Sequence, residues 1–217
     1  GKSTLFNLIA GTLKPNDGKV MFNNKNITGL PSYELFSRGI LRTFQIAHEF
    51  TNLTVLENLM MVPSNQSGEN LINALFMRKK FKSEEDEIRN KAYEVIEFLN
   101  LKHLANELAG NLSGGQKKLL ELGRTMMVES KLVLLDEVGA GVNRTLLKDL
   151  GTAILRLNKE KGYTFCMIEH DMDFISRMCN PVIVLSEGSV LFQGTPEEVK
   201  NNELVIESYL GRSNKNN

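Results

Sequence analysis

The sequence has no excess of charge of one sign, no long hydrophobic run and no paired set of cysteines. Lys and Arg together number 26, as do Asp and Glu, so no bulk electrostatic field attracts nucleic acid or an anionic membrane. No apolar run reaches the roughly 18–20 residues that a membrane-spanning helix requires. Cys166 and Cys179 match no metal-site or redox-motif spacing, and Cys166 is expected in the core because it lies in an apolar run. The composition favours a globular domain.

The chain also lacks internal repeats, and its apolar pattern predicts an α/β domain with an inserted helical region. The α/β core is assigned to residues 1–50 and 111–200, the helical subdomain to residues 51–110, and a C-terminal helix and tail to residues 201–217. The first expected elements are a helix over 1–10 whose apolar face is Leu5, Leu8 and Ile9, strands at 18–22 and 41–45, and a turn at 23–26. Helices are expected near 55–62, 71–81, 84–99 and 145–161, and strands buried on both faces at 131–136 and 163–169. A hairpin over 181–193 that turns at Glu187 and Gly188 and a disordered tail from Asn214 complete the chain.

Residues 111–124 carry the most informative pattern in the chain. Ser113 precedes Gly114 and Gly115, and leucines then recur at helical spacing, which predicts a helix with Ser113 at its N-cap. The N–H groups of a helix N-terminus attract anions, and glycines let a phosphate group approach the backbone closely. For this segment taken alone, an ordinary serine-capped helix without a ligand is the alternative.

The first four residues, Gly1 to Thr4, read Gly-Lys-Ser-Thr, which is the end of the phosphate-binding loop G-x-x-x-x-G-K-[ST]. In such a loop Lys2 reaches the β- and γ-phosphates, and the hydroxyl of Ser3 is a ligand of Mg²⁺. The glycine spacing that makes the motif diagnostic is not in the sequence. A surface turn that opens a helix is therefore the alternative for this tetrapeptide.

An acidic pair ends the apolar strand predicted at residues 131–136. Open α/β sheets bind ligands at the carboxyl ends of their strands, which favours Asp136 as a Mg²⁺ ligand and Glu137 as the general base that polarises an attacking water. A solvated acidic strand end is the alternative. His170 follows the next strand and is suited to contact the γ-phosphate, and Gln45 is suited to contact Mg²⁺-bound water. Either of these two residues alone is more often structural.

Together these residues resemble the ATP-binding subunits of ABC transporters. Five segments carry the resemblance in the family's order: Gly1 to Thr4 for the end of Walker A, Gln45 for the Q-loop, 112–116 (LSGGQ) for the signature, 132–137 (LVLLDE) for Walker B, and His170 for the switch histidine. The resemblance implies a P-loop NTPase fold, with a mostly parallel sheet and an inserted helical subdomain. It also implies an ATPase that uses ATP and Mg²⁺.

Finer features are similar to the importers of branched-chain amino acids. They are residues 140–143 (AGVN), residues 168–172 (IEHDM), and the segments 194–198 and 207–211. Urea importers share the His-Asp-Met segment and lipopolysaccharide-export ATPases share the ending, so these solutes stay open as alternatives. A soluble ABC ATPase without a transport role is another alternative, but such proteins usually carry tandem ATPase domains or long coiled-coil inserts, which this sequence does not show.

The resemblance also implies a site shared between two ATP-binding subunits, identical or different, that are arranged head to tail. One subunit would hold MgATP through Gly1, Lys2, Ser3, Thr4, Gln45, Asp136, Glu137 and His170, with Ser3, Gln45 and Asp136 around the metal and with Gln45, Glu137 and His170 in catalysis. The other subunit would close on the γ-phosphate with its signature residues Ser113, Gly114, Gly115 and Gln116.

Further partners follow from the same resemblance. They are transmembrane permease subunits and, through these, an extracytoplasmic solute-binding protein, but no nucleic acid. The subunit would be peripheral, at the cytoplasmic face of the plasma membrane. An apolar set in the helical subdomain either receives a short permease helix or is that subdomain's own core: Phe50, Leu53, Val55, Leu56, Leu59 and Met60.

Two departures from the family pattern affect the expected activity. The strands, the adenine-stacking aromatic residue and the front of the phosphate loop, which the family places before Gly1, are not in the sequence. We therefore expect these 217 residues alone to bind ATP poorly and to hydrolyse little. Val138 stands where the family usually has proline, and because valine keeps its N–H and a freer φ, we expect a small effect on the placement of Glu137.

Overall fold

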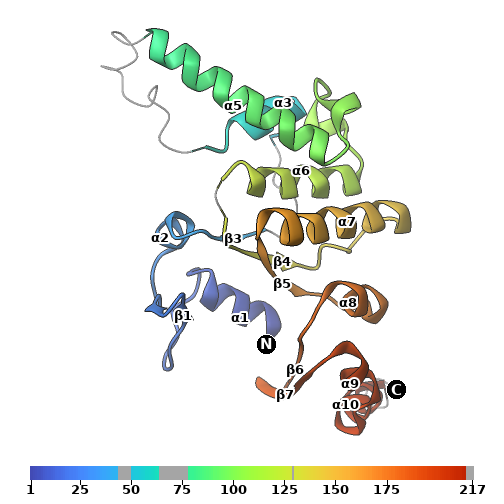
Figure 1. Ribbon diagram of the computed structural model, residues 1–217. Helices are drawn as coiled ribbons and strands as arrows, with labels where there is room; N and C mark the ends of the chain where they lie inside the picture. The colour runs from blue at the N-terminus through green and yellow to red at the C-terminus, as the bar shows by residue number, and fades with distance from the viewer. Residues whose placement is uncertain (44–49, 64–77, 129, 214–217) are drawn as a thin grey trace. The chain divides into compact units, whose positions relative to one another are not determined.

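The computed structural model describes residues 1–43, 50–63, 78–128 and 130–213, and every structural statement below concerns these residues (Figure 1). The chain forms two compact units, which are described separately. One consists of residues 36–166, and the other of residues 1–35 together with 167–217.

A short sheet and the helices beside it build the unit of residues 36–166. Strands β3 (Ile40–Arg42) and β4 (Leu132–Asp136) are parallel, and the sheet order is β3-β4-β5, where β5 (Thr164–Ile168) ends beyond this unit. The helical elements are α3 (Val55–Met60), α5 (Arg78–Phe98), the 3₁₀ turns η2 (Lys102–Leu104) and η3 (Ala109–Asn111), α6 (Gly114–Met126) and α7 (Arg144–Lys161). Helix α6 packs on α7, and α3 packs on α5 and α6 (Figure 1).

These elements confirm the predicted strand at 131–136 and the predicted helices near 55–62, 84–99 and 145–161. The end of the predicted strand at 41–45 and most of the predicted helix at 71–81 lie outside the described residues.

Strand β4 lies at the centre of the core of this unit. Val133, Leu134 and Leu135 are at most 2% exposed, as predicted for a strand covered on both faces. Side chains of α6 and α7 meet the end of β4, since Leu122, Leu135, Leu150 and Ile154 line one small cavity. Full burial of one such side chain contributes about 1.5–3 kcal/mol, so this packing fixes the strand end that leads to Asp136.

Strand β5 differs from the prediction. Its side chains alternate in exposure, from exposed Thr164 through half-buried Phe165 to exposed Cys166, and Ile168 is buried at its end. The expectations of a strand buried on both faces and of a core position for Cys166 are therefore wrong. An apolar run alone does not determine how many faces of a strand are covered, because that depends on what packs against the sheet.

The unit of residues 1–35 and 167–217 opens with helix α1 (Lys2–Ile9). Phe6 is 3% exposed and Ala10 is 8% exposed, whereas Leu5 is 43% exposed. The predicted apolar face of Leu5, Leu8 and Ile9 is therefore wrong at Leu5, whereas Leu8 and Ile9 are half-buried. The most buried residues are Phe6 and Ala10, which form an i, i+4 pair on one face of the helix. The remaining elements are β1 (Met21–Phe22), β2 (Lys25–Asn26), α2 (Ser32–Ser37), α8 (Met172–Met178), β6 (Val182–Ser186), β7 (Ser189–Gly194), α9 (Pro196–Asn201) and α10 (Glu203–Ser213).

Two hairpins in this unit confirm predicted turns. Asn23 and Asn24, with φ of 48° and 61°, connect β1 to β2, so the turn is tighter than the predicted 23–26. Glu187 and Gly188, with φ of 49° and 85°, connect β6 to β7 as predicted. Pairs of residues with positive φ match the twist of hairpin strands. Among the helices in the described ranges, none has the length and hydropathy to cross a bilayer.

Candidate functional site

The start of helix α6 is built as the sequence predicts. The hydroxyl of Ser113, the N-cap, accepts a hydrogen bond from the N–H of Gln116 at 3.4 Å. The N–H of Ser113 in turn donates to Oε1 of Gln116 at 2.9 Å. This reciprocal capping box holds the Gln116 side chain against the helix start, and Ser113 itself is exposed.

The two glycines after Ser113 have different surroundings. A Cβ atom on Gly114 would lie 3.7 Å from the carbonyl oxygen of Gly141, an ordinary contact distance. A Cβ atom on Gly115 would lie 2.5 Å from Cδ1 of Leu146, which real Cβ atoms essentially never do. The buried Gly115 is thus required by the packing of α6 against the first turn of α7, whereas Gly114 is exposed.

The segment that precedes α7 adjoins this helix start. Asn143 is the N-cap of α7, and its Oδ1 accepts a hydrogen bond from the N–H of Leu146 at 2.9 Å. Since Gly141 lies beside Gly114 and Leu146 beside Gly115, the structure brings the AGVN segment next to the signature residues.

The acidic pair at the end of β4 has one buried and one half-buried member. Asp136 is 4% exposed, and Glu137 has a φ of 50°, in the left-handed region. A non-glycine residue with this backbone conformation costs on the order of 1 kcal/mol, so the surrounding structure must fix the turn. Val138, which is 5% exposed, packs into the core directly after it and anchors that turn.

Arg42 is a residue of this site that the sequence interpretation missed. Its Nη2 donates to Oδ2 of Asp136 at 2.8 Å, and the two side chains are 15% and 5% exposed. Arg42 stands three residues before Gln45 in the sequence, but only the parallel pairing of β3 with β4 brings it to a carboxylate 94 residues away. The carboxylate remains the kind of hard oxygen ligand that Mg²⁺ prefers.

Gln45 lies outside the described residues, but a second missed residue anchors the chain shortly after it. Asn58 of α3 is fully buried, and its Oδ1 accepts a hydrogen bond from the N–H of Phe50 at 2.9 Å. Its Nδ2 donates to the carbonyl oxygens of Phe50, Leu53 and Thr54 at 3.0, 3.2 and 3.0 Å. The sequence sign of this role is an amide side chain, Asn58, on the same helix as the apolar residues Val55 and Leu59.

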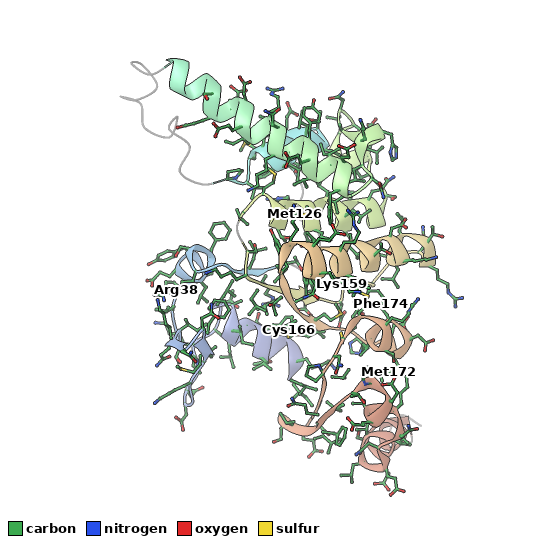
Figure 2. The ribbon with its side chains drawn as sticks, viewed as in Figure 1. Arg38, Met126, Lys159, Cys166, Met172 and Phe174 are labelled. Carbon is green, nitrogen blue, oxygen red and sulfur yellow. The ribbon has the colours of Figure 1, made fainter. Side chains whose placement is uncertain are left out.

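The remaining predicted residues lie in the unit of residues 1–35 and 167–217. Gly1 is the N-cap of α1, and Lys2, Ser3 and Thr4 form its first turn, with Ser3 and Thr4 exposed. His170 is exposed just after β5. It precedes the N-cap of α8, whose first turn is anchored by the buried Phe174 (Figure 2). Of the predicted phosphate contacts in that unit, Lys2 is half-buried and His170 is exposed.

The apolar set of the helical region divides between core and surface. Val55 and Leu59 are fully buried and Leu56 is 6% exposed, so these three are core residues. Leu53 and Met60 line a groove of about 570 Å³ between α3 and α5, and Phe50 is 48% exposed. Charged side chains also line this groove: Glu57, Glu84, Glu85 and Arg89.

Comparison with known proteins identifies relatives over nearly the whole chain. Residues 1–140 match the family described as ABC transporter, and residues 189–213 match the family described as branched-chain amino acid ATP-binding cassette transporter. The chain is 41% identical over 211 residues to the probable branched-chain amino acid transport ATP-binding protein LivG of Archaeoglobus fulgidus, covering 97% of this chain and 80% of the relative. It is 43% identical over 215 residues to LivG of Methanocaldococcus jannaschii, covering 97% and 82%. The high-affinity transport protein BraF of Pseudomonas aeruginosa is 35% identical over 213 residues, covering 98% and 84%.

Solved structures show the same fold. A nucleotide-free ATP-binding cassette from an ABC transporter has a TM-score of 0.80 and 41% identity, covering 96% of this chain and 83% of that one. The ADP conformation of an ATP-binding cassette of an ABC transporter has a TM-score of 0.80 and 40% identity, covering 97% and 84%. The predicted P-loop NTPase fold is thereby confirmed.

Proposed function

Because the chain belongs to the ABC transporter family, we propose that it is the ATP-binding and ATP-hydrolysing subunit of an importer for branched-chain amino acids. The observation that carries the solute assignment is the match of residues 189–213, which comprise β7, α9 and α10, to the branched-chain family. The names of relatives at 41% and 43% identity state the same transport and support it.

In this proposal the phosphates of ATP bind at the first turn of α1. Lys2 supplies a positive charge there, and the backbone N–H groups of the helix start add their partial charge. Glu137, half-buried in a left-handed turn directly after β4, is the general base for the attacking water. The exposed His170 donates a hydrogen bond to the γ-phosphate.

Asp136 and Ser3 would hold Mg²⁺, with Gln45 as a further contact. The ion, when bound, neutralises charge that develops on the transferred phosphoryl group. Asp136 fits this role because it is a hard oxygen donor at the end of a rigid, buried strand.

The start of α6 acts on ATP held by a second ATP-binding subunit, identical or different. Exposed Ser113 and open Gly114 would approach the γ-phosphate, while Gln116 and Gly115 keep the helix start in shape. This assignment makes the signature an anion cap that works between subunits.

The groove between α3 and α5 would receive a short helix of a transmembrane permease. Leu53 and Met60 give it an apolar lining, and four charged side chains offer it polar partners. We assign residues 51–110, which contain this groove, to a helical subdomain inserted in the core. The subunit would be peripheral at the cytoplasmic face of the plasma membrane and would meet an extracytoplasmic solute-binding protein only through the permease.

Solute uptake tests this proposal. The full-length gene product is expressed with the permease and solute-binding protein of a branched-chain amino acid importer in cells that lack leucine uptake, and uptake of radiolabelled leucine and urea is measured. We expect leucine uptake that is lost with Glu137→Gln and retained with Glu160→Gln, an exposed glutamate of α7. Urea uptake without leucine uptake would contradict the solute, and uptake that survives Glu137→Gln would contradict the general base.

A further inference from the structure

The pairing of β3 with β4 determines that Arg42 meets Asp136. Arg42 is the register partner of Leu134 in the parallel pair, and Asp136 lies two residues beyond Leu134. Side chains two residues apart on a strand lie on one face of the sheet. The long side chain of Arg42 therefore lies on the same face as the Asp136 carboxylate and reaches Oδ2 at 2.8 Å.

The environment of this ion pair makes it strong and costly to break. The Arg42 side chain is 15% exposed and the Asp136 side chain is 5% exposed, so water screens the two charges little. A charge-assisted hydrogen bond of this length also fixes the direction of the carboxylate. The predicted Mg²⁺ ligand thus already has a cation on one of its two oxygens.

We propose that Arg42 is a positioning residue that holds the Asp136 carboxylate in the metal-free site and competes with Mg²⁺ for it. The inference rests on the proposed function, because it takes Asp136 as the Mg²⁺ ligand. Two cations that share one carboxylate repel each other, so the guanidinium weakens metal binding while it stabilises the site without metal.

A direct test measures the affinity for Mn²⁺, as a probe for Mg²⁺, by electron paramagnetic resonance in the presence of ADP. Replacing Arg42 by Gln removes the competing charge, and we expect Mn²⁺ to bind on the order of tenfold more tightly, while the melting temperature without metal falls. Arg42→Lys keeps the charge, and we expect its affinity for Mn²⁺ to stay within about twofold of the wild type. Arg38→Gln, at an exposed arginine four residues earlier, is the matched control and should change neither quantity.

The outcomes separate this inference from the proposed function. If Asp136→Asn and the wild type bind Mn²⁺ alike, the metal assignment of the proposed function is wrong, and the inference falls with it. If Asp136→Asn loses Mn²⁺ binding but Arg42→Gln binds it no more tightly than the wild type, only the inference is wrong. If Arg42→Gln does not fold, a measurement on the wild-type protein tests the inference instead. The guanidinium NMR signal of Arg42, assigned by its loss in Arg42→Lys, should then shift when Mg²⁺ is added with ADP, and an unchanged signal would overturn the inference.

Discussion

The start of α6 and the end of β4 are both predicted nucleotide contacts, but different kinds of interaction hold them in place. Ser113 is fixed by Gln116, three residues away, through two hydrogen bonds. Asp136 is fixed by Arg42, 94 residues away, through a buried ion pair across two parallel strands. A local cap contributes about 1 kcal/mol, whereas a buried ion pair that loses one partner leaves a desolvated charge. The helix start should therefore tolerate substitutions that the strand end does not.

The largest expected effect is at the strand end. Asp136→Ala leaves the guanidinium of Arg42, only 15% exposed, without this carboxylate, and we expect a loss of about 3 kcal/mol in the free energy of unfolding. Urea denaturation without nucleotide measures the loss. Asp149→Ala, at an exposed aspartate of α7, is the control and should stay within about 0.5 kcal/mol of the wild type. A loss below about 1 kcal/mol for Asp136→Ala would remove the contrast between the two regions.

This contrast also explains which parts of the site could be predicted from the sequence. The cap at Ser113 and the turn at Glu187 and Gly188 depend on neighbours within a few residues, so their patterns are visible in the sequence and the structure confirms them. The pairing of Arg42 with Asp136 depends on which strands are adjacent, and the exposure of Cys166 depends on what covers β5. No local pattern encodes either of these.

The fold shows the same division. The apolar run of β4 and the periodicity of α7 predicted their positions to within a residue or two, because burial on one strand or one helix face leaves a direct pattern. The predicted apolar face of α1 included the exposed Leu5 and omitted the buried Phe6, because Leu5, Phe6, Leu8 and Ile9 are all apolar and such a run does not say which side meets the core.

The next expected effect lies within the signature itself. Gly115→Ala places a methyl group 2.5 Å from Cδ1 of Leu146, and we expect a loss of about 1–3 kcal/mol in the free energy of unfolding. Gly114→Ala meets only an ordinary contact at 3.7 Å, so its stability should be unchanged within about 0.5 kcal/mol. Chemical denaturation of both variants measures this difference.

A second variant verifies the cause of the Gly115 effect. Leu146→Ala would keep the Leu146 Cβ atom, 2.7 Å from the added methyl group, so the background used is Leu146→Gly, which removes every close side-chain atom of Leu146. In the Leu146→Gly background Gly115→Ala should cost much less than in the wild type. An equal cost in both backgrounds would show that the close approach to Leu146 is not the reason for glycine at this position.

A smaller effect is expected for the cap of α6. Ser113→Ala removes the oxygen that accepts from the N–H of Gln116, and we expect a loss of about 1 kcal/mol in the free energy of unfolding. Ser113→Gly should cost only a few tenths, since glycine is tolerated at an N-cap. Denaturation of Ser113→Ala, Gln116→Ala and the double variant measures the coupling of the capping box. If the two single losses simply add, the hydrogen bonds between these side chains and the backbone do not act as a unit.

The smallest effect compares two capping boxes, one of which titrates. Helix α3 has the box of Thr54 and Glu57, in which the N–H and the hydroxyl of Thr54 donate to Oε2 of Glu57 at 2.7 and 2.8 Å. The hydrogen bond from the backbone N–H of Thr54, followed by that from its hydroxyl, lowers the pKa of Glu57. Because the pKa is lower in the folded chain, this contribution to stability is present above the unfolded pKa of glutamate and is lost as the pH falls through the folded value. The box of Ser113 and Gln116 has no titratable side chain, so its hydrogen bonds should not change as the pH falls through the pKa of Glu57.

Titration of the Glu57 carboxyl signal by NMR should give a pKa below that of an unstructured peptide with the same sequence. In Glu57→Gln the amide signals at the start of α3 should no longer respond to that titration. A Glu57 pKa at or above the peptide value would contradict the capping box at α3, and the two helix starts would then not be built alike.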